Sequence, residues 1–164
     1  MKYNLLRSYC KLNLFLEVGK KETKTKLHNI QSLVYIINLF DEIKIKKINS
    51  KKDKINFIGS FSRDVKKNNN SILKSLFLLR KTGYIAQKQS YFLEIKKNIP
   101  PFSGMGGGSS NSATIIKYFL KRKKILPKEV DYFSKILGTD LKLFLKSSQL
   151  FQQNLRNIEI IKKK

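Results

Sequence analysis

The stretch Gly104-Met105-Gly106-Gly107-Gly108-Ser109-Ser110-Asn111 carries more information than any other part of this chain. It holds four of the chain's eight glycines within five positions, directly before an apolar segment with helical spacing. Glycine tolerates positive φ angles and leaves room for close approach, so such a loop exposes backbone N–H groups to an anion. The N-terminus of the following helix adds unpaired N–H donors and the positive end of its dipole. The stretch therefore predicts a phosphate-binding loop, and a phosphate suggests a nucleotide.

The two commonest nucleotide-binding motifs do not fit this loop. A P-loop requires a lysine directly after its last glycine, whereas Ser109 follows Gly108. The dinucleotide fingerprint is Gly-x-Gly-x-x-Gly, while the loop reads Gly104-x-Gly106-x-Gly108 after a long connection over 98–105. A phosphate loop of another kind is the favoured interpretation, and a flexible loop with helix-capping serines is the alternative.

Hydrophobic patterning predicts strands in the first part of the chain and mostly helices after it. Residues 8–18 alternate as a strand does, with Cys10 on a small or apolar face and Lys11 and Asn13 on the opposite face. The other predicted elements are a strand over 28–38 interrupted at 38–41, a hairpin of 42–48 with 54–58, a helix from 72 ended by Gly83, a strand over 91–95, a helix carrying Ala113, Ile116 and Leu120, a helix from Pro127 to Gly138, and a last strand over 157–161. This order indicates an α+β fold rather than strict β–α–β alternation.

The net charge of +24 invites a nucleic-acid interpretation, because basic chains attract phosphate backbones. However, 30 of the 35 basic residues are lysine and only five are arginine, the residue that base readout favours. The lysines are also scattered along the chain. We therefore expect solvated lysine-rich faces and no nucleic-acid partner, and keep a basic nucleic-acid-binding module as the alternative.

Length and composition indicate one domain of a cytoplasmic protein. The chain has 164 residues, and no apolar run approaches the ~18–20 residues that a membrane span requires. The N-terminus has no apolar secretion signal, and the single cysteine, Cys10, excludes an internal disulfide framework. The chain stops at Lys164, directly after an apolar segment, an ending as typical of an interrupted protein as of a finished one.

Three motifs resemble one superfamily of small-molecule kinases. Pro100–Ala113, PPFSGMGGGSSNSA, resembles the phosphate-binding loop of the galactokinase–homoserine kinase–mevalonate kinase–phosphomevalonate kinase (GHMP) superfamily. Residues 8–16, followed by 28–33, are similar to the N-terminus of one of its families, the 4-diphosphocytidyl-2-C-methyl-D-erythritol kinases. Residues 137–144, LGTDLKLF, look like the Leu-Gly-Ala-Asp-Val-Pro-x-Phe segment of that family. The motifs occur in the family's order, and the resemblance spans nearly all of the chain.

The resemblance implies both a fold and an activity. Residues 1–164 would form the ATP-binding N-terminal GHMP domain, an α+β fold with a mixed sheet packed by helices, as in domain 2 of ribosomal protein S5. The family's C-terminal GHMP domain would be absent. The implied reaction is ATP-dependent phosphorylation of the 2-hydroxyl of 4-diphosphocytidyl-2-C-methyl-D-erythritol, in non-mevalonate (MEP) isoprenoid biosynthesis. The implied cofactors are ATP and Mg²⁺, and the implied partner is a small cytidyl-diphosphate substrate.

The resemblance also assigns residues. Asp140 corresponds to the family's catalytic aspartate, a candidate base, and Lys11 to its catalytic lysine, which offsets charge in the transition state. Asn13 and His28 correspond to substrate-binding positions. No residue is implied as a protein ligand of a metal. The implied ATP-binding residues are Pro100, Pro101, Phe102, Ser103, Gly104, Met105, Gly106, Gly107, Gly108, Ser109 and Ser110.

The chain departs from the family's pattern at several points. Leu27 stands where the family has an aromatic residue before the histidine, and Phe102 and Ser103 replace two glycines, which stiffens the front of the loop. Thr139 replaces an alanine beside the presumed base, and Lys142 replaces a proline. The family's second domain, with a third glycine-rich motif, has no counterpart here. An active kinase completed by a separate C-terminal chain and an inactive fragment both remain open.

Overall fold

The computed structural model describes residues 3–21, 23, 28–121, 123–146, 149–153 and 157–160. Leu27 and the last residue of the final predicted strand, Ile161, lie outside these ranges. The elements in chain order are β1 (Asn4–Lys21), β2 (His28–Ile48), β3 (Lys54–Ile58), α1 (Ser71–Lys81), β4 (Ser90–Lys96), α2 (Gly107–Leu120), α3 (Pro127–Leu137), α4 (Leu141–Leu145), β5 (Gln149–Gln153) and β6 (Asn157–Ile160).

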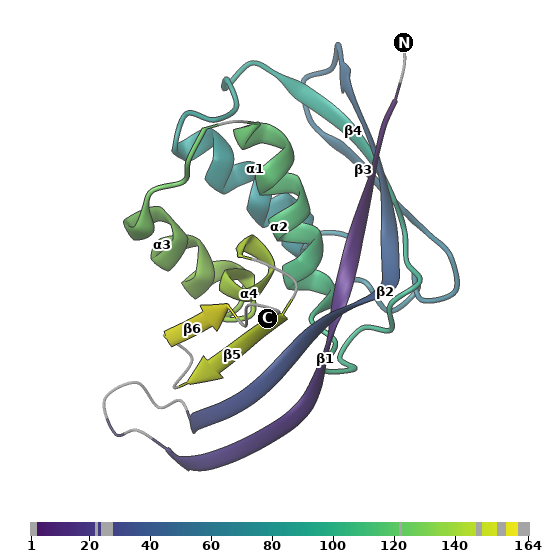
Figure 1. The fold of residues 1–164 in the computed structure, drawn as a ribbon. Coiled ribbons are helices and arrows are strands. Elements are labelled where there is room, and N and C mark those ends of the chain that lie inside the picture. The colour runs from purple at the N-terminus through teal and green to yellow at the C-terminus, as the bar shows by residue number, and fades with distance from the viewer. Residues whose placement is uncertain are drawn as a thin grey trace.

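The strands form one mixed sheet that is covered on one face by the helices (Figure 1). The order in the sheet is β3-β4-β2-β5-β6, and β1 pairs with the other edge of the long strand β2. The β3–β4 pair is parallel and the other pairs are antiparallel. The predicted α+β fold, with a mixed sheet packed by helices, is confirmed.

Two predictions about the first strands are wrong. The interruption at 38–41 does not occur, because β2 runs unbroken and a bulge in its pairing with β1 absorbs the irregular segment, between Tyr9↔Phe40 and Lys11↔Ile36. Residues 42–48 and 54–58 do not form a hairpin either. Instead, β4 lies between β2 and β3, and β3 pairs with β4 in parallel.

The parallel pairing follows from helix α1. Parallel neighbours require a crossover connection, and α1 supplies it between β3 and β4. Asn70 caps this helix by accepting a hydrogen bond from Leu73 N at 3.0 Å. The crossover places the apolar face of α1 in one core with β2 and β4. A β2–β3 hairpin would not supply this connection.

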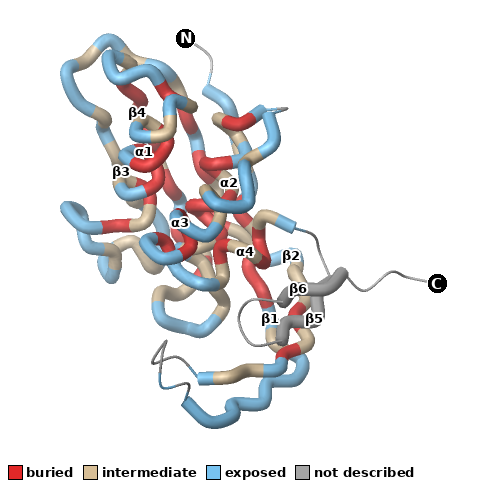
Figure 2. Tube along the Cα trace, turned by 90° about the vertical axis from the view of Figure 1, so that its left-hand side faces the viewer, coloured by how far each residue is buried: buried red, intermediate tan, exposed pale blue. Residues whose placement is uncertain are grey.

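The core lies between the sheet and the helices (Figure 2). Its residues are apolar side chains of β2, β4, α1, α2 and α3. They include Ile43, Ile45, Leu93, Ile95, Ile72, Leu76, Leu79, Ile116 and Phe133, each at most 1% exposed. The stripe predicted for the helix with Ala113, Ile116 and Leu120 is buried in the core. Among the described residues, no helix is long and apolar enough to cross a membrane.

The β1–β2 hairpin extends beyond this core as an arm (residues 12–21 and 28–35), as Figures 1 and 2 show. The small face of β1 is buried at Ser8 and Cys10. The register with β2 shifts between Asn13 and Phe15, so the alternation predicted over 8–18 is interrupted there, and Leu14 and Val18 are each 58% exposed.

Candidate active site

The glycine loop approaches its neighbours so closely that it needs residues without a Cβ. Gly106, the N-cap of α2, has φ 69°, and a Cβ there would lie 2.8 Å from the Phe144 ring and 3.2 Å from Asp140 Oδ2. A Cβ on Gly107 would lie 3.1 Å from Ile99. The glycine run therefore lets the start of α2 sit directly against the carboxylate of Asp140.

The N-terminus of α2 offers free hydrogen-bond donors. Ser110 N donates to Gly106 O at 2.8 Å, which is the first bond of the helix. The N–H groups of Gly107, Gly108 and Ser109 come before it and have no acceptor within the helix. With the positive end of the helix dipole, they form a site for an anion such as a phosphate.

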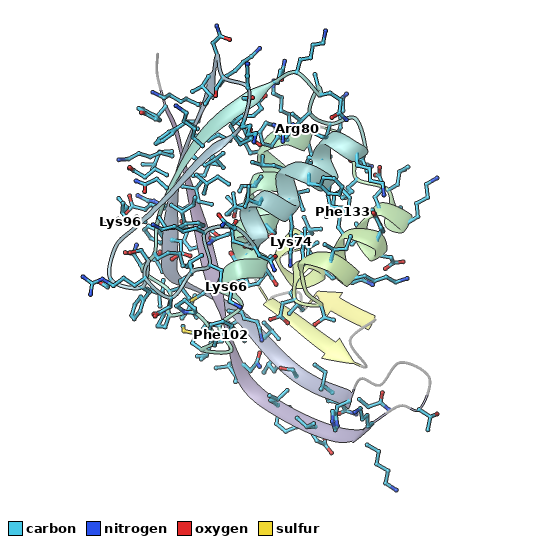
Figure 3. The ribbon with its side chains drawn as sticks, turned by 180° about the vertical axis from the view of Figure 1, so that it is seen from behind. Lys66, Lys74, Arg80, Lys96, Phe102 and Phe133 are labelled. Carbon is cyan, nitrogen blue, oxygen red and sulfur yellow. The ribbon has the colours of Figure 1, made fainter. Side chains whose placement is uncertain are left out.

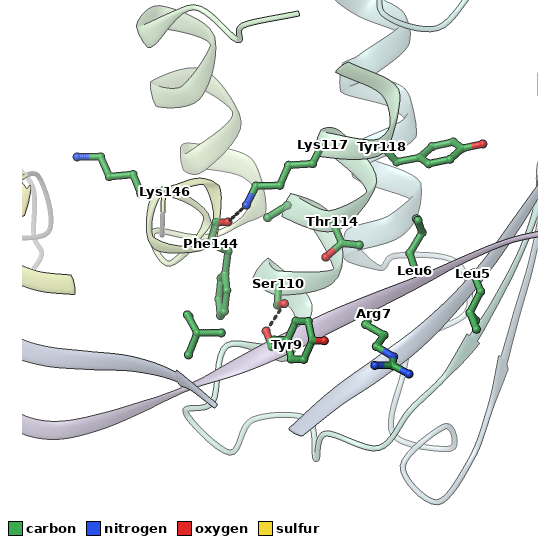
Figure 4. Close-up of a pocket in the computed structure, with 12 residues that line it drawn as sticks. Leu5, Leu6, Arg7, Tyr9, Ser110, Thr114, Lys117, Tyr118, Phe144 and Lys146 are labelled. Carbon is green, nitrogen blue, oxygen red and sulfur yellow. Dashed lines mark hydrogen bonds between the residues drawn. The ribbon is translucent and has the colours of Figure 1, made fainter. Parts of the chain in front are cut away.

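Strand β1 holds the loop from one side. Lys11 N donates to Met105 O at 3.0 Å. The Ser110 hydroxyl donates to Tyr9 O and lies 2.8 Å from Ser8 Oγ (Figure 4). Ser110 is 2% exposed, so its side chain serves this anchor rather than facing a ligand. Its predicted ATP-binding role stays a prediction that its side-chain contacts do not support.

The buried carboxylate of Asp41 holds the loop from the other side. Its Oδ1 accepts hydrogen bonds from Asn98 N at 2.8 Å and Ile99 N at 2.9 Å. Its Oδ2 accepts from Asn111 Nδ2 at 3.0 Å and from the Lys97 ammonium. Asp41 is fully buried, and it joins the segment before the loop to the helix after it. Sequence reasoning missed this network; its signal was a carboxylate directly after the apolar pair Leu39-Phe40.

Lys11 and Asp140 meet beside the loop. Lys11 Nζ lies 3.5 Å from Asp140 Oδ2 and donates to Asn13 Oδ1 at 3.0 Å. Burial raises the pKa of the Asp140 carboxyl, and the nearby Lys11 ammonium opposes this shift in part. The structure thus brings together three of the four residues that the resemblance assigned to catalysis and substrate binding.

The remaining residue, His28, lies apart from them. Lys11 pairs with Ile36 of β2, and His28 is eight residues farther along that strand, roughly 26 Å of extended chain. Its side chain is exposed, with Nδ1 3.1 Å from Gly19 O. The predicted contact of His28 with substrate therefore stays a prediction.

A pocket of about 580 Å³ opens at the glycine loop. Of the predicted ATP-binding residues, all except Met105 and Ser110 line it, and so does Asp140. The segment after β3, which sequence reasoning missed because it carries no motif, adds Asp64, Val65, Lys66 and Asn69. The wall that the predictions did not include is completed by Phe57, Asn70, Ser71, Lys97, Asn111 and Leu137.

A second hollow, of about 900 Å³, lies between β1, α2 and α4 (Figure 4). Leu5, Leu6 and Phe144 give it an apolar floor, and Lys117 spans part of it by donating to Phe144 O. It is larger than the loop pocket, but neither Lys11 nor Asp140 lines it. The chemistry therefore assigns the loop pocket as the candidate active site.

The residues of the loop pocket fit a nucleoside triphosphate. Free N–H groups can donate to phosphate oxygens, and Gly106 and Gly107 permit those oxygens to approach closely. Among the described residues, no group of three or more His, Cys, Asp or Glu side chains is arranged to hold a metal ion.

Comparisons with known proteins relate this chain to a family of kinases. Residues 70–131 match the family model described as GHMP kinases N terminal domain. The 4-diphosphocytidyl-2-C-methyl-D-erythritol kinase of Pelagibacter ubique is 41% identical over 145 residues, which cover 87% of this chain and 50% of that protein. The kinase of the same name from Ureaplasma parvum is 34% identical over 143 residues, covering 85% and 52%. The chain spans about half the length of the curated relatives it matches.

Solved structures share the fold. A crystal structure of 4-(cytidine 5'-diphospho)-2C-methyl-D-erythritol kinase aligns with a TM-score of 0.69 at 20% identity, over 96% of this chain and 55% of that one. Homoserine kinase from Cytophaga hutchinsonii aligns with a TM-score of 0.64 at 15% identity, over 96% and 51%. The chain belongs to the GHMP family of small-molecule kinases, and its described residues form the N-terminal domain of that family.

Proposed function

We propose that this chain supplies the ATP-binding domain of a kinase that phosphorylates the 2-hydroxyl of 4-diphosphocytidyl-2-C-methyl-D-erythritol, in non-mevalonate isoprenoid biosynthesis. The names of the relatives support the substrate. The observation that carries the proposal is the Lys11–Asp140 pair, 3.5 Å apart, at the phosphate-binding end of α2. Such a pair beside free N–H donors suits phosphoryl transfer to an alcohol.

Asp140 is the proposed base. The acceptor hydroxyl oxygen bonds to the γ-phosphorus, the bond from that phosphorus to the ADP oxygen breaks, and the hydroxyl proton passes to Asp140. The raised pKa of Asp140 brings it closer to the operating pH, which makes the carboxylate a better proton acceptor. The Lys11 ammonium lies beside it and offsets the negative charge that develops on the transferring oxygens.

The glycine loop is the proposed phosphate site. The N–H groups of Gly107, Gly108 and Ser109 bind the phosphates of ATP, and the Asp41 network keeps the loop in place while they do so. ATP supplies the phosphoryl group, and Mg²⁺ neutralises its charge. Because the described residues hold no acidic metal cluster, Mg²⁺ would be carried mainly by the phosphate oxygens.

A second domain belongs to the proposal. The curated relatives are about twice as long as the part that this chain matches, so a C-terminal domain, which a separate chain could supply, would complete the site. The expected location of such an enzyme with small soluble substrates is the cytoplasm.

The test uses this chain alone and with the C-terminal half of the Pelagibacter ubique relative. Binding of a non-hydrolysable ATP analogue is measured by calorimetry, and phosphorylation of the cytidyl substrate by product formation with ATP and Mg²⁺. We expect nucleotide binding by this chain and turnover when the second half is added. Lys11→Met and Asp140→Asn should retain nucleotide binding and lose turnover. No nucleotide binding, or turnover unaffected by Asp140→Asn, would contradict the proposal.

A further inference from the structure

Phe102 is in an unusual state for a phenylalanine. Its side chain is 98% exposed, so its apolar ring gains nothing from burial. Its φ is 61°, in the left-handed region, which is unfavourable for a residue with a Cβ. A glycine would remove both costs at this position. Two unfavourable features in one loop residue indicate that Phe102 has a role in a ligand-bound state of the chain.

The position of Phe102 suggests that role. It lines the mouth of the loop pocket, as does Lys66, and Figure 3 labels both on the same side of the molecule. Pro101, Phe57 and Val65 line this pocket as well, together with the amide of Asn69. The ring therefore faces a pocket that offers apolar surface and a hydrogen-bonding side chain, as a nucleobase requires.

The chemistry of the pocket orients a bound nucleotide. The reacting phosphate must lie near Asp140 and Lys11, where the free N–H groups of α2 point. The rest of a nucleotide then extends toward the other lining residues, Phe57, Val65 and Phe102 among them. An exposed ring with a free face there is suited to stack on the base.

We propose that Phe102 is a base-stacking residue that closes over the nucleobase of the bound nucleotide. This inference rests on the proposed function, because it requires a nucleotide in the loop pocket. The ring loses its exposure on binding, and the stacking interaction offsets the strained backbone. Phe102 then raises affinity for base-bearing ligands without touching the phosphates.

The first experiment compares two ligands on the intact chain. A non-hydrolysable ATP analogue carries the base, and inorganic tripolyphosphate does not. Phe102→Leu keeps the strained position and the apolar bulk but removes the aromatic face. We expect it to weaken binding of the ATP analogue about tenfold, the usual size of a base–aromatic stacking contribution, and to leave tripolyphosphate binding unchanged. Phe102→Tyr should restore binding of the analogue.

The second experiment uses fluorescence. The chain has no tryptophan, so Phe102→Trp introduces a single tryptophan, whose fluorescence is followed. The matched control is Phe77→Trp, because Phe77 is 63% exposed on α1 and does not line the loop pocket. We expect the ATP analogue to quench the tryptophan at 102 and tripolyphosphate to leave it unchanged, with no response to either ligand at 77.

The outcomes separate this inference from the proposed function. Equal losses for both ligands in Phe102→Leu would mean that the residue acts only through loop conformation, and would overturn the inference alone. Unchanged analogue binding in Phe102→Leu would do the same. If the wild-type chain bound neither ligand, the proposed function and the inference would both fall.

Discussion

The two halves of the β1–β2 hairpin differ in how they are held. In the first half, Ser8 and Cys10 are fully buried and Lys11 is 6% exposed, under the glycine loop and α2. In the arm, the pairing of β1 with β2 shifts register between Asn13 and Phe15, and Leu14 and Val18 are each 58% exposed. The strand β1 is thus buried under the loop at one end and exposed at the other.

The difference decides which functional residues meet. Lys11 lies where β1 contacts the loop and reaches Asp140, and Asn13, at the start of the arm, accepts a hydrogen bond from Lys11. His28 lies on the arm and does not. Anchoring by tertiary contacts, rather than position in a motif, determines which candidate residues share a site. Variants in the anchored region can therefore be compared with variants in the arm or at an exposed neighbouring residue.

The largest expected effect is on catalysis. With the second half of a relative supplied, Asp140→Asn should lower the rate of phosphoryl transfer about 100- to 10,000-fold, because the hydroxyl loses its base. His28→Ala on the arm should raise KM and change kcat much less. Steady-state kinetics measure both. Equal losses of kcat would show that the arm reaches the catalytic pair during turnover, and would break the comparison.

The next effect is on stability. Asp41→Asn removes the charge partner of the buried Lys97 and should lower the free energy of unfolding by about 3–5 kcal/mol. Glu42→Gln removes an exposed pair with Lys96 one position farther along β2, and should cost about 0–1 kcal/mol. Urea unfolding measures the two variants side by side. A similar cost for both would show that Asp41 does not hold the loop.

A graded glycine series tests the close approach at the loop. Gly106→Ala should destabilise the fold by about 2–4 kcal/mol, through its positive φ and contact with Phe144. Gly104→Ala has positive φ but no neighbour, and should cost about 1–2 kcal/mol. Gly19→Ala on the arm meets only ordinary contacts and should be nearly neutral. Thermal unfolding measures the order of the three losses of stability. An unchanged stability of Gly106→Ala would contradict the close contact between Gly106 and Phe144.

The smallest effect is a pH dependence at Asp140. Its pKa is raised in the folded state, so the folded chain binds more protons than the unfolded chain at pH values between the two pKa values. Stability should therefore fall as pH rises through that interval. Asp140→Asn should be more stable than wild type at neutral pH, with the difference vanishing at low pH. A variant that is less stable at neutral pH would show that the Lys11 pair outweighs the burial of the carboxyl.

Local patterns predicted much of the fold and one wall of the site. The three longer helices, the strand at β1 and the glycine loop before α2 depend on residues close together in the chain, and these elements are present. The hairpin of 42–48 with 54–58 failed, because strand pairing depended on where α1 could bury its apolar face. Asp41 and the segment 64–69 were missed, because each contributes through contacts with distant parts of the chain.

By itself, the sequence determined that a glycine-rich loop precedes a helix, because the conformational freedom of glycine and the free N–H groups of a helix start are local properties. It also placed Lys11 and Asn13 on one face of a strand. Only the tertiary structure decided that Asp140 lies against Gly106 and beside Lys11, that Ser110 faces β1, and that His28 lies apart. These arrangements depend on burial and pairing between distant segments. A local sequence pattern does not indicate which distant segments lie close together in space.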